Sequence, residues 1–203
     1  KEVLAQAGAV PTFMAKYSDR MDGCSGHIHQ SLWQGDANAF WDGAAPHHMS
    51  STLMSYLAGA LQTMPELFAL YAPNVNSYKR YVSGSWAPTA ASWAIENRTS
   101  SLRAITNGET AIRVEHRVPG ADVNPYLGFA ACLAGGLYGI ERGLTPPPPA
   151  QGNVYETEGL PPLPRMLDEA IERLDASAVA REFLGDAFVD HYVAMRRWEV
   201  EKH

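Results

Sequence analysis

Apolar residues recur along this chain at two different periods, and the two periods predict helices and strands in separate regions. Apolar positions three and four residues apart predict a helix over residues 48–64, and a further helical turn over 65–71. A longer apolar run follows Asn124 and Pro125, which suit the N-cap and the first turn of a helix that continues to about Gly143. Three more helices are predicted over residues 165–174, 177–184 and 186–201.

Shorter segments have the composition of strands. We expect strands over residues 10–17, 27–33, 91–95, 101–105 and 111–118. The pairs Gly35-Asp36, Asn97-Arg98 and Asn107-Gly108 suit the turns between them, and Asn-Gly is a strong hairpin signal. Strands with one inserted helix, then more strands and then helices, predict an α+β fold rather than an alternating one. We expect a mostly antiparallel sheet with packed helices and a helical C-terminal part.

The chain divides by composition into three regions. Residues 1–143 carry the predicted sheet and the long helix, and residues 144–164 contain a run of four prolines and several glycines. That composition is typical of a surface excursion. Residues 165–203 would add the last helices to the same domain.

Charge and composition exclude some classes of protein. A net charge of −6 gives no global basic field for nucleic acid, and no apolar run reaches the roughly 20 residues that span a bilayer. Cys24 and Cys132 stand at no metal-ligand spacing, so we expect reduced thiols and a cytoplasmic location. The chain begins at Lys1, inside a helix-like pattern, and we therefore expect it to be a fragment.

The first candidate site is the strand from Asp22 to Trp33. Side chains alternate along a strand, so His27, His29 and Ser31 would share one face, while apolar neighbours point toward a core. A face with two imidazoles and a hydroxyl suits a functional site. A hydrogen-bonded histidine pair on a half-exposed sheet is the alternative.

A second polar strand brings charges to the same region. Alternation places Arg113, Glu115 and Arg117 on one face, with His116 directed away from them. A carboxylate and an imidazole on neighbouring strands could share a divalent cation, while arginines bind anions. That arrangement suits phosphoryl transfer, where positioning and charge neutralisation dominate. Spacing alone leaves open whether these arginines form a site or a solvated ionic surface.

Three ordered stretches together resemble the catalytic domain of the glutamine synthetase family, the glutamate–amine ligases. They are the histidine strand Gly23–Trp33, the arginine-rich block Asn76–Arg103 with its flap, and Arg113–Leu127. The resemblance covers residues 1–143 as a partial catalytic domain, and more loosely the C-terminal helices. It implies that ATP phosphorylates the γ-carboxylate of glutamate, and that ammonia or an amine then attacks the γ-glutamyl phosphate.

The resemblance implies roles for the residues that match the family's motifs. His27 and Glu115 would be metal ligands for Mg²⁺ or Mn²⁺, and His27 would also border the glutamate site. Gly23 would contact glutamate through its backbone. Arg80 and Arg117 would hold the substrate carboxylate and the transferred phosphoryl group.

The nucleotide side has its own set of matches. Arg98 and Arg103 would stabilise phosphate, and Arg113 would contact ATP. His29 and Ser31 would border the nucleotide. Arg80, Arg98 and Arg117 are the expected catalytic residues, because they would neutralise developing charge.

Two positions depart from the family pattern. Trp86 stands where the flap usually carries a glutamate, two residues before Pro88, and Asp22 replaces an asparagine. A tryptophan offers no base, but its ring can cover an apolar or cationic alkylamine. We therefore expect an amine acceptor larger than ammonia, such as an alkylamine or a polyamine.

The family also implies a ring-shaped homo-oligomer, with each site completed by a neighbour's N-terminal domain. That domain and the early strands with most metal-binding glutamates are absent from residues 1–203, so we expect the isolated chain to be inactive. The sequence leaves two alternatives to a ligase. One is a non-catalytic scaffold or assembly subunit of the same family. The other, a metal-dependent hydrolase using His27 and His29, lacks a third ligand at suitable spacing.

Overall fold

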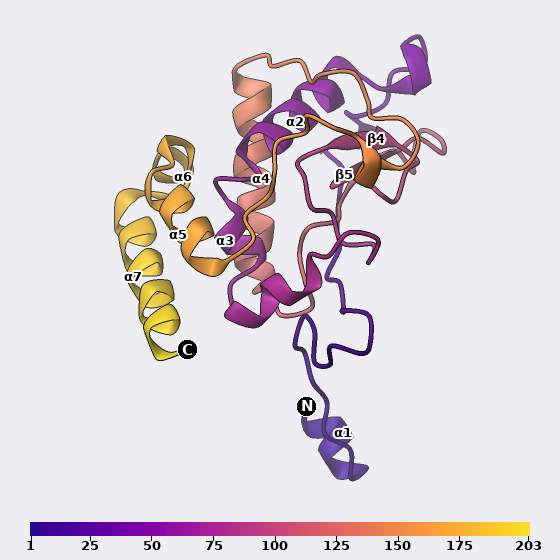
Figure 1. Ribbon diagram of the computed structural model, residues 1–203. Helices are drawn as coiled ribbons and strands as arrows, with labels where there is room; N and C mark the ends of the chain where they lie inside the picture. Colours follow the sequence, from indigo (N-terminus) through magenta and orange to yellow (C-terminus); the bar gives the residue numbers. More distant parts are fainter.

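Two long helices cross at the centre of the protein, whose computed structural model describes residues 1–203 (Figure 1). Helix α2 (Ser51–Thr63) begins at Ser50, whose side chain accepts a hydrogen bond from the Leu53 amide. Helix α4 (Pro125–Glu141) begins at Asn124, whose side chain accepts from the amides of residues 126 and 127. Both predicted helices are therefore confirmed, and α4 starts with the predicted cap.

Four short strands form the main sheet, in the order β1-β6-β5-β4. Their bounds are β1 Ile28–Gln30, β6 Arg113–His116, β5 Leu102–Ile105 and β4 Trp93–Ile95. The β1–β6 and β5–β6 pairs are antiparallel, whereas β4–β5 is parallel. A separate antiparallel hairpin joins β2 (Trp33–Gln34) to β3 (Ala37–Asn38) through the predicted Gly35-Asp36 turn. The expected α+β fold, with mostly antiparallel pairing, is confirmed.

Some expected elements differ in the structure. Residues 10–17 form no strand, because no other segment pairs with them; Val10 is 96% exposed and Phe13 55% exposed. The Asn97-Arg98 turn does not fold β4 back against β5. Residues 96–101 instead return the chain so that β5 runs parallel to β4. The Asn107-Gly108 turn does lie in an antiparallel hairpin, within the longer loop between Ile105 and Arg113.

The C-terminal helices pack together on one side of α4. The C-terminal helices predicted from periodicity are α5 (Leu167–Asp175), α6 (Ala178–Leu184) and α7 (Asp186–Lys202). They gather beside α3 (Phe68–Tyr71), with α5 packed against both α3 and α7 (Figure 1). Helix α1 (Glu2–Gln6) projects at the N-terminal end (Figure 1). Three 3₁₀ turns complete the elements, at Pro46–His48, Val75–Arg80 and Val154–Glu156.

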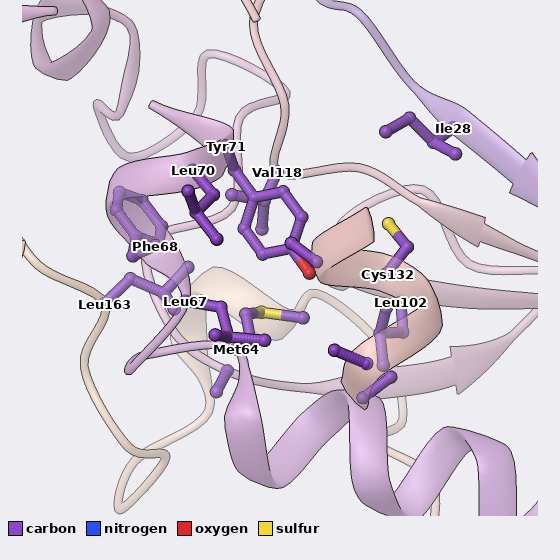
Figure 2. Packing of buried hydrophobic residues seen from close by; sticks show 14 of the residues in the cluster. Ile28, Met64, Leu67, Phe68, Leu70, Tyr71, Leu102, Val118, Cys132 and Leu163 are labelled. Carbon is purple, nitrogen blue, oxygen red and sulfur yellow. The ribbon is translucent and has the colours of Figure 1, made fainter. Parts of the chain in front are cut away.

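One apolar core lies behind the sheet. Met64, Phe68 and Tyr71 from the helices meet Leu102 of β5 and Cys132 of α4 in this interior (Figure 2). Leucine and aromatic side chains of this size each stabilise the fold by about 1.5–3 kcal/mol when fully buried. Because one face of the sheet is covered by the core, the opposite face is left for polar side chains. No helix of the protein has both the length and the apolar character needed to cross a membrane.

Candidate active site

The polar face of the sheet carries one row of side chains from three strands. His29 of β1 lies opposite Glu115 of β6, and Glu115 lies opposite Arg103 of β5. The next row, with Ile28, His116 and Leu102, faces the core. Strand alternation therefore builds the site and the core from alternate residues of the same strands, as the sequence predicted for the two polar strands.

Glu115 is the centre of this row, and only 4% of it is exposed. Its Oε1 lies 3.0 Å from His27 Nδ1 and accepts a 2.9 Å hydrogen bond from Arg117 Nη1. Its Oε2 accepts a 3.3 Å bond from Arg103 Nη1. Burial would raise the pKa of Glu115, but the His27 contact and the charge of Arg117 outweigh it and lower the pKa to about 2. The carboxylate is thus ionised throughout the physiological range.

A cavity of about 530 Å³ opens above this carboxylate. Seven residues line it, and every one was predicted as a site residue: His27, His29, Trp86, Arg98, Arg103, Glu115 and Arg117. The guanidinium of Arg98 forms no hydrogen bond or ion pair within the chain, unlike those of Arg103 and Arg117. The cavity therefore presents three arginines but only one carboxylate, and it suits an anionic ligand.

Arg80 and Gly23 lie beside this cavity but do not line it. Arg80 is 3% exposed, and its Nη2 donates to the carbonyls of Arg117, Val118 and Pro119. Its Nη1 has no partner. A Cβ added to Gly23 would lie 2.7 Å from Cγ of Arg80, so only glycine allows this approach. Gly23 and Arg80, two of the four residues expected at the glutamate site, are thus packed against each other.

Arg113 and Ser31 lie farther from the cavity. Arg113 Nε donates a 3.1 Å hydrogen bond to His29 Nδ1, and Ser31 Oγ accepts a 2.9 Å bond from Trp33 Nε1. Burial lowers the pKa of His29; the nearby charge of Glu115 opposes that change, and the charge of Arg113 adds to it. Because the net pKa is lowered, His29 is neutral near pH 7.

Comparisons with known proteins agree with this geometry. The family described as "Glutamine synthetase, catalytic domain" matches residues 1–203. The chain belongs to the glutamine synthetase family.

Relatives within the family include ligases for different amines. The chain is 46% identical to type-1 glutamine synthetase 2 of Dictyostelium discoideum, covering 98% of this chain and 39% of that protein. It is 44% identical to a glutamate–isopropylamine ligase of Pseudomonas, covering 100% of this chain and 45% of that protein. It is 45% identical to a γ-glutamylethanolamide synthetase of Streptomyces coelicolor, covering 99% of this chain and 42% of that protein.

Solved structures show the same fold. GmaS without ligand superposes with a TM-score of 0.90 at 32% identity, covering 100% of this chain and 47% of that one. A GmaS complex with ADP gives the same TM-score and identity. The chain spans less than half the length of the relatives and structures named here.

Glu96 belongs to the site but was not among the residues expected from the sequence. Its carboxylate accepts hydrogen bonds from Arg103 Nη2 and from the Thr106 amide. Burial would lower the pKa of Arg103, but the bonds to Glu96 and Glu115 raise it overall. An acidic residue directly before the Asn97-Arg98 turn was the available signal, although nothing in the sequence showed that it pairs with Arg103.

Trp86 lies on the loop at the mouth of the cavity. The residue is 61% exposed, and its φ of 62° is in the left-handed region, which is costly for a residue other than glycine. Its carbonyl lies 3.5 Å from Arg117 Nη2. Trp86 therefore lies at the edge of the cavity that the three arginines line.

The metal-binding capacity of this face is limited. His27 Nδ1 and Glu115 Oε1 are adjacent and could bind one divalent cation, which suits an imidazole and a carboxylate. No group of three histidine, cysteine or acidic residues in the chain is arranged to hold a metal. His116 is fully buried against Tyr71, in agreement with the expectation that it is directed away from the polar face. Residues 1–203 therefore fit part of a metal site, and further ligands would have to come from outside them.

Proposed function

We propose that the chain forms the C-terminal part of the catalytic domain of an ATP-dependent glutamate–amine ligase, acting through γ-glutamyl phosphate. The observation that supports this most directly is the cavity in which Arg98, Arg103 and Arg117 surround the ionised Glu115. Phosphoryl transfer needs fixed positive charge around the transferred group. The family relationship supports the same reaction.

ATP is the proposed nucleotide, and Arg98 would be its principal contact within these residues. Arg98 has no competing carboxylate, whereas Arg103 is bound by Glu96 and Glu115. Arg113, His29 and Ser31 would border the nucleotide, at the edge of β1. The GmaS complex with ADP supports nucleotide use in this fold.

Mg²⁺ or Mn²⁺ is the proposed metal, held in part by His27 and Glu115. Bound there, a divalent ion would neutralise phosphate charge. Glu115 would contribute its negative charge at any pH above about 2, because its pKa is lowered to that value.

Glutamate is the proposed carboxylate substrate. Arg80 keeps one guanidinium nitrogen, Nη1, without a partner, while its other terminal nitrogen is held by three carbonyls. A buried arginine fixed in this way can donate to a carboxylate with little loss of side-chain entropy. Gly23 lies against Arg80 and leaves room for the arginine side chain.

An alkylamine or polyamine is the proposed acceptor. The exposed indole of Trp86 stands at the mouth of the cavity and brings no carboxylate to it. Two relatives are named for isopropylamine and for ethanolamide formation.

The larger protein is proposed to act as a homo-oligomeric ring, with the C-terminal helices in the same domain as the sheet, since α5 packs against α3. The proposed location is cytoplasmic, and the two unpaired cysteines, Cys24 and Cys132, support a reducing compartment.

A panel of amines tests this function. The full-length protein that contains this chain would be assayed for glutamate-dependent release of ADP with ammonia, methylamine, ethanolamine and putrescine. We expect turnover that is fastest with one of the carbon-containing amines. A clear preference for ammonia would contradict the proposed acceptor. An absence of turnover with every amine, together with no heat on titration with ATP, would instead favour the non-catalytic scaffold.

A further inference from the structure

A segment rich in proline runs across the sheet and contacts the loops on both sides of the cavity. This segment, residues 145–164, is here called the strap. Figure 1 shows it in orange, running from the end of α4 past β4 and β5 and then back toward α5. The strap has no long element of its own, only the 3₁₀ turn Val154–Glu156.

The strap is fixed to the sheet at both ends. Trp93 Nε1 donates a 2.7 Å hydrogen bond to the Pro147 carbonyl, and the Ala150 amide donates to the Trp93 carbonyl at 2.9 Å. Near the other end, the Leu163 amide donates to the Thr89 carbonyl at 3.1 Å. Prolines have few backbone conformations, so these few bonds are enough to hold such a segment in place.

The middle of the strap is attached to the loop that carries Arg98. Asn97 Nδ2 donates a 2.8 Å hydrogen bond to the Gly152 carbonyl, and the Val154 amide donates a 3.0 Å bond to Thr99 Oγ1. These two bonds flank Arg98, one on each side in sequence. Val154 is 5% exposed, so this attachment is also packed.

The next residue of the strap, Tyr155, contacts the other loop. Its hydroxyl donates a 3.0 Å hydrogen bond to the carbonyl of Ala87, the residue that follows Trp86. Ala87 is 2% exposed, so water cannot easily replace this donor. Burial raises the pKa of Tyr155 despite the nearby Arg117 and Arg80, so the phenol keeps its proton at neutral pH.

Trp86 depends on such support. Its left-handed φ of 62° is costly for a side chain of this size, and such strain persists only where the surroundings hold it. Arg117 reaches the Trp86 carbonyl only at 3.5 Å, the longest side-chain hydrogen bond that the site makes. The bond from the Tyr155 hydroxyl is shorter, at 3.0 Å, and it goes to the carbonyl of the next residue, Ala87.

We propose that Tyr155 is a positioning residue that fixes the loop bearing Trp86, and that the strap thereby links this loop to the loop bearing Arg98. Tyr155 acts through Trp86 and does not contact the reacting atoms. The effect of Tyr155 on amine binding rests on the proposed function. The effect of Tyr155 on the position of the Trp86 indole does not.

The first test is spectroscopic and needs no catalysis. Residues 1–203 would be labelled with fluorotryptophan, and the Trp86 resonance would be assigned with Trp86→Phe. Tyr155→Phe keeps the ring and removes only the hydroxyl. We expect the Trp86 resonance to shift and to narrow, while that of Trp198, on α7, stays unchanged. Tyr126→Phe, at a residue that is 82% exposed on α4, is the matched control and should move neither resonance.

The second test uses the full-length protein. Loss of this partly buried hydrogen bond is expected to raise KM for the preferred amine about fivefold, with a smaller change in kcat. A Trp86 resonance that is identical in Tyr155→Phe and in the original chain would overturn the proposal, provided that both chains show the same thermal unfolding midpoint. A resonance that moves without any change in amine KM would support the positioning role, and would count against Trp86 as the amine contact.

Discussion

At the scale of single residues, the site is organised around one buried charge. Glu115 is surrounded by His27, Arg103 and Arg117, and each of these contacts is 3.3 Å or shorter. A carboxylate buried beside arginines is strongly stabilised in its ionised form. The arginines in turn need the carboxylate, because without it their buried charge would be uncompensated. The residue that binds the metal in the proposed reaction also keeps two arginines in place.

The pH dependence of stability should report on Glu115. Its pKa is 4.5 in an unperturbed chain and about 2 in the folded protein, so the native state favours the ionised form. The resulting stability, at most about 3 kcal/mol, is complete above pH 4.5 and is lost as the pH falls toward 2. We expect urea unfolding of the original chain to weaken over this range more than that of Glu115→Gln.

The neutral variant should also be less stable at pH 7, because Arg103 and Arg117 lose their partner. Because the lowered pKa sets the contribution of this charge, we expect the loss to be at most about 3 kcal/mol. Glu158→Gln, at an exposed residue of the strap, is the control and should follow the original chain at every pH. Equal pH dependence in all three proteins would mean that Glu115 is not the buried charge described here.

At the scale of elements, helix α2 and helix α4 approach each other through glycine. A Cβ on Gly59 would lie 2.2 Å from the Gly135 carbonyl oxygen, and one on Gly139 would lie 2.0 Å from the Ser55 carbonyl oxygen. These contacts are with backbone atoms of the facing helix, which cannot move away as a flexible side chain can. The crossing places α4 behind the sheet and so determines the position of the polar face.

Gly59→Ala should therefore destabilise the protein, even though alanine favours helices. The gain in helix propensity is about 1 kcal/mol, whereas separating two packed helices costs about 1–3 kcal/mol or more. We expect a net loss of about 2 kcal/mol, measured by urea unfolding. Ser51→Ala, at an exposed residue of α2, should change stability by less than about 0.5 kcal/mol. A Gly59→Ala variant that is as stable as the original chain would show that the helices do not cross this closely.

Elements with local signals were predictable from the sequence, and those that depend on distant partners were not. Asn124 and Pro125 mark the start of α4 by local capping chemistry, so the first residue of that helix was predicted correctly. Residues 10–17 have the composition of a strand, but whether they pair depends on segments far away in the chain. The parallel pairing of β4 and β5 could not be read from the Asn97-Arg98 turn, because a turn signal does not give the direction in which the chain continues.

The same distinction holds for the site. Strand alternation pointed to His27, His29, Glu115 and Arg117, and the family resemblance implied roles for Trp86, Arg98 and Arg103. The structure brings all seven together. Glu96 and Tyr155 were missed because their importance lies in contacts with Arg103 and Ala87, which belong to other segments. No periodicity or motif in the sequence carries that information.

At the scale of the whole molecule, residues 1–203 present an open face lined by arginines. One wall carries the arginines and Glu115, while the chain spans less than half the length of its relatives. Helix α4 also exposes an apolar stripe on its outer face, formed by Tyr126, Phe129, Leu133 and Leu137. Exposed apolar stripes of this kind are typical of surfaces that other polypeptide covers.

The open site predicts that residues 1–203 alone do not catalyse the reaction. Two donors, His27 and Glu115, fill only part of the coordination shell of Mg²⁺ or Mn²⁺, and no third histidine, cysteine or acidic residue is placed to join them. We expect the purified chain to release ADP from ATP, glutamate and an amine at the uncatalysed rate, at any Mg²⁺ or Mn²⁺ concentration tried. The full-length protein, assayed beside it, is the control. Turnover by the 203-residue chain that disappears in Glu115→Gln would show that this wall is sufficient, and that the missing ligands are supplied by the substrates.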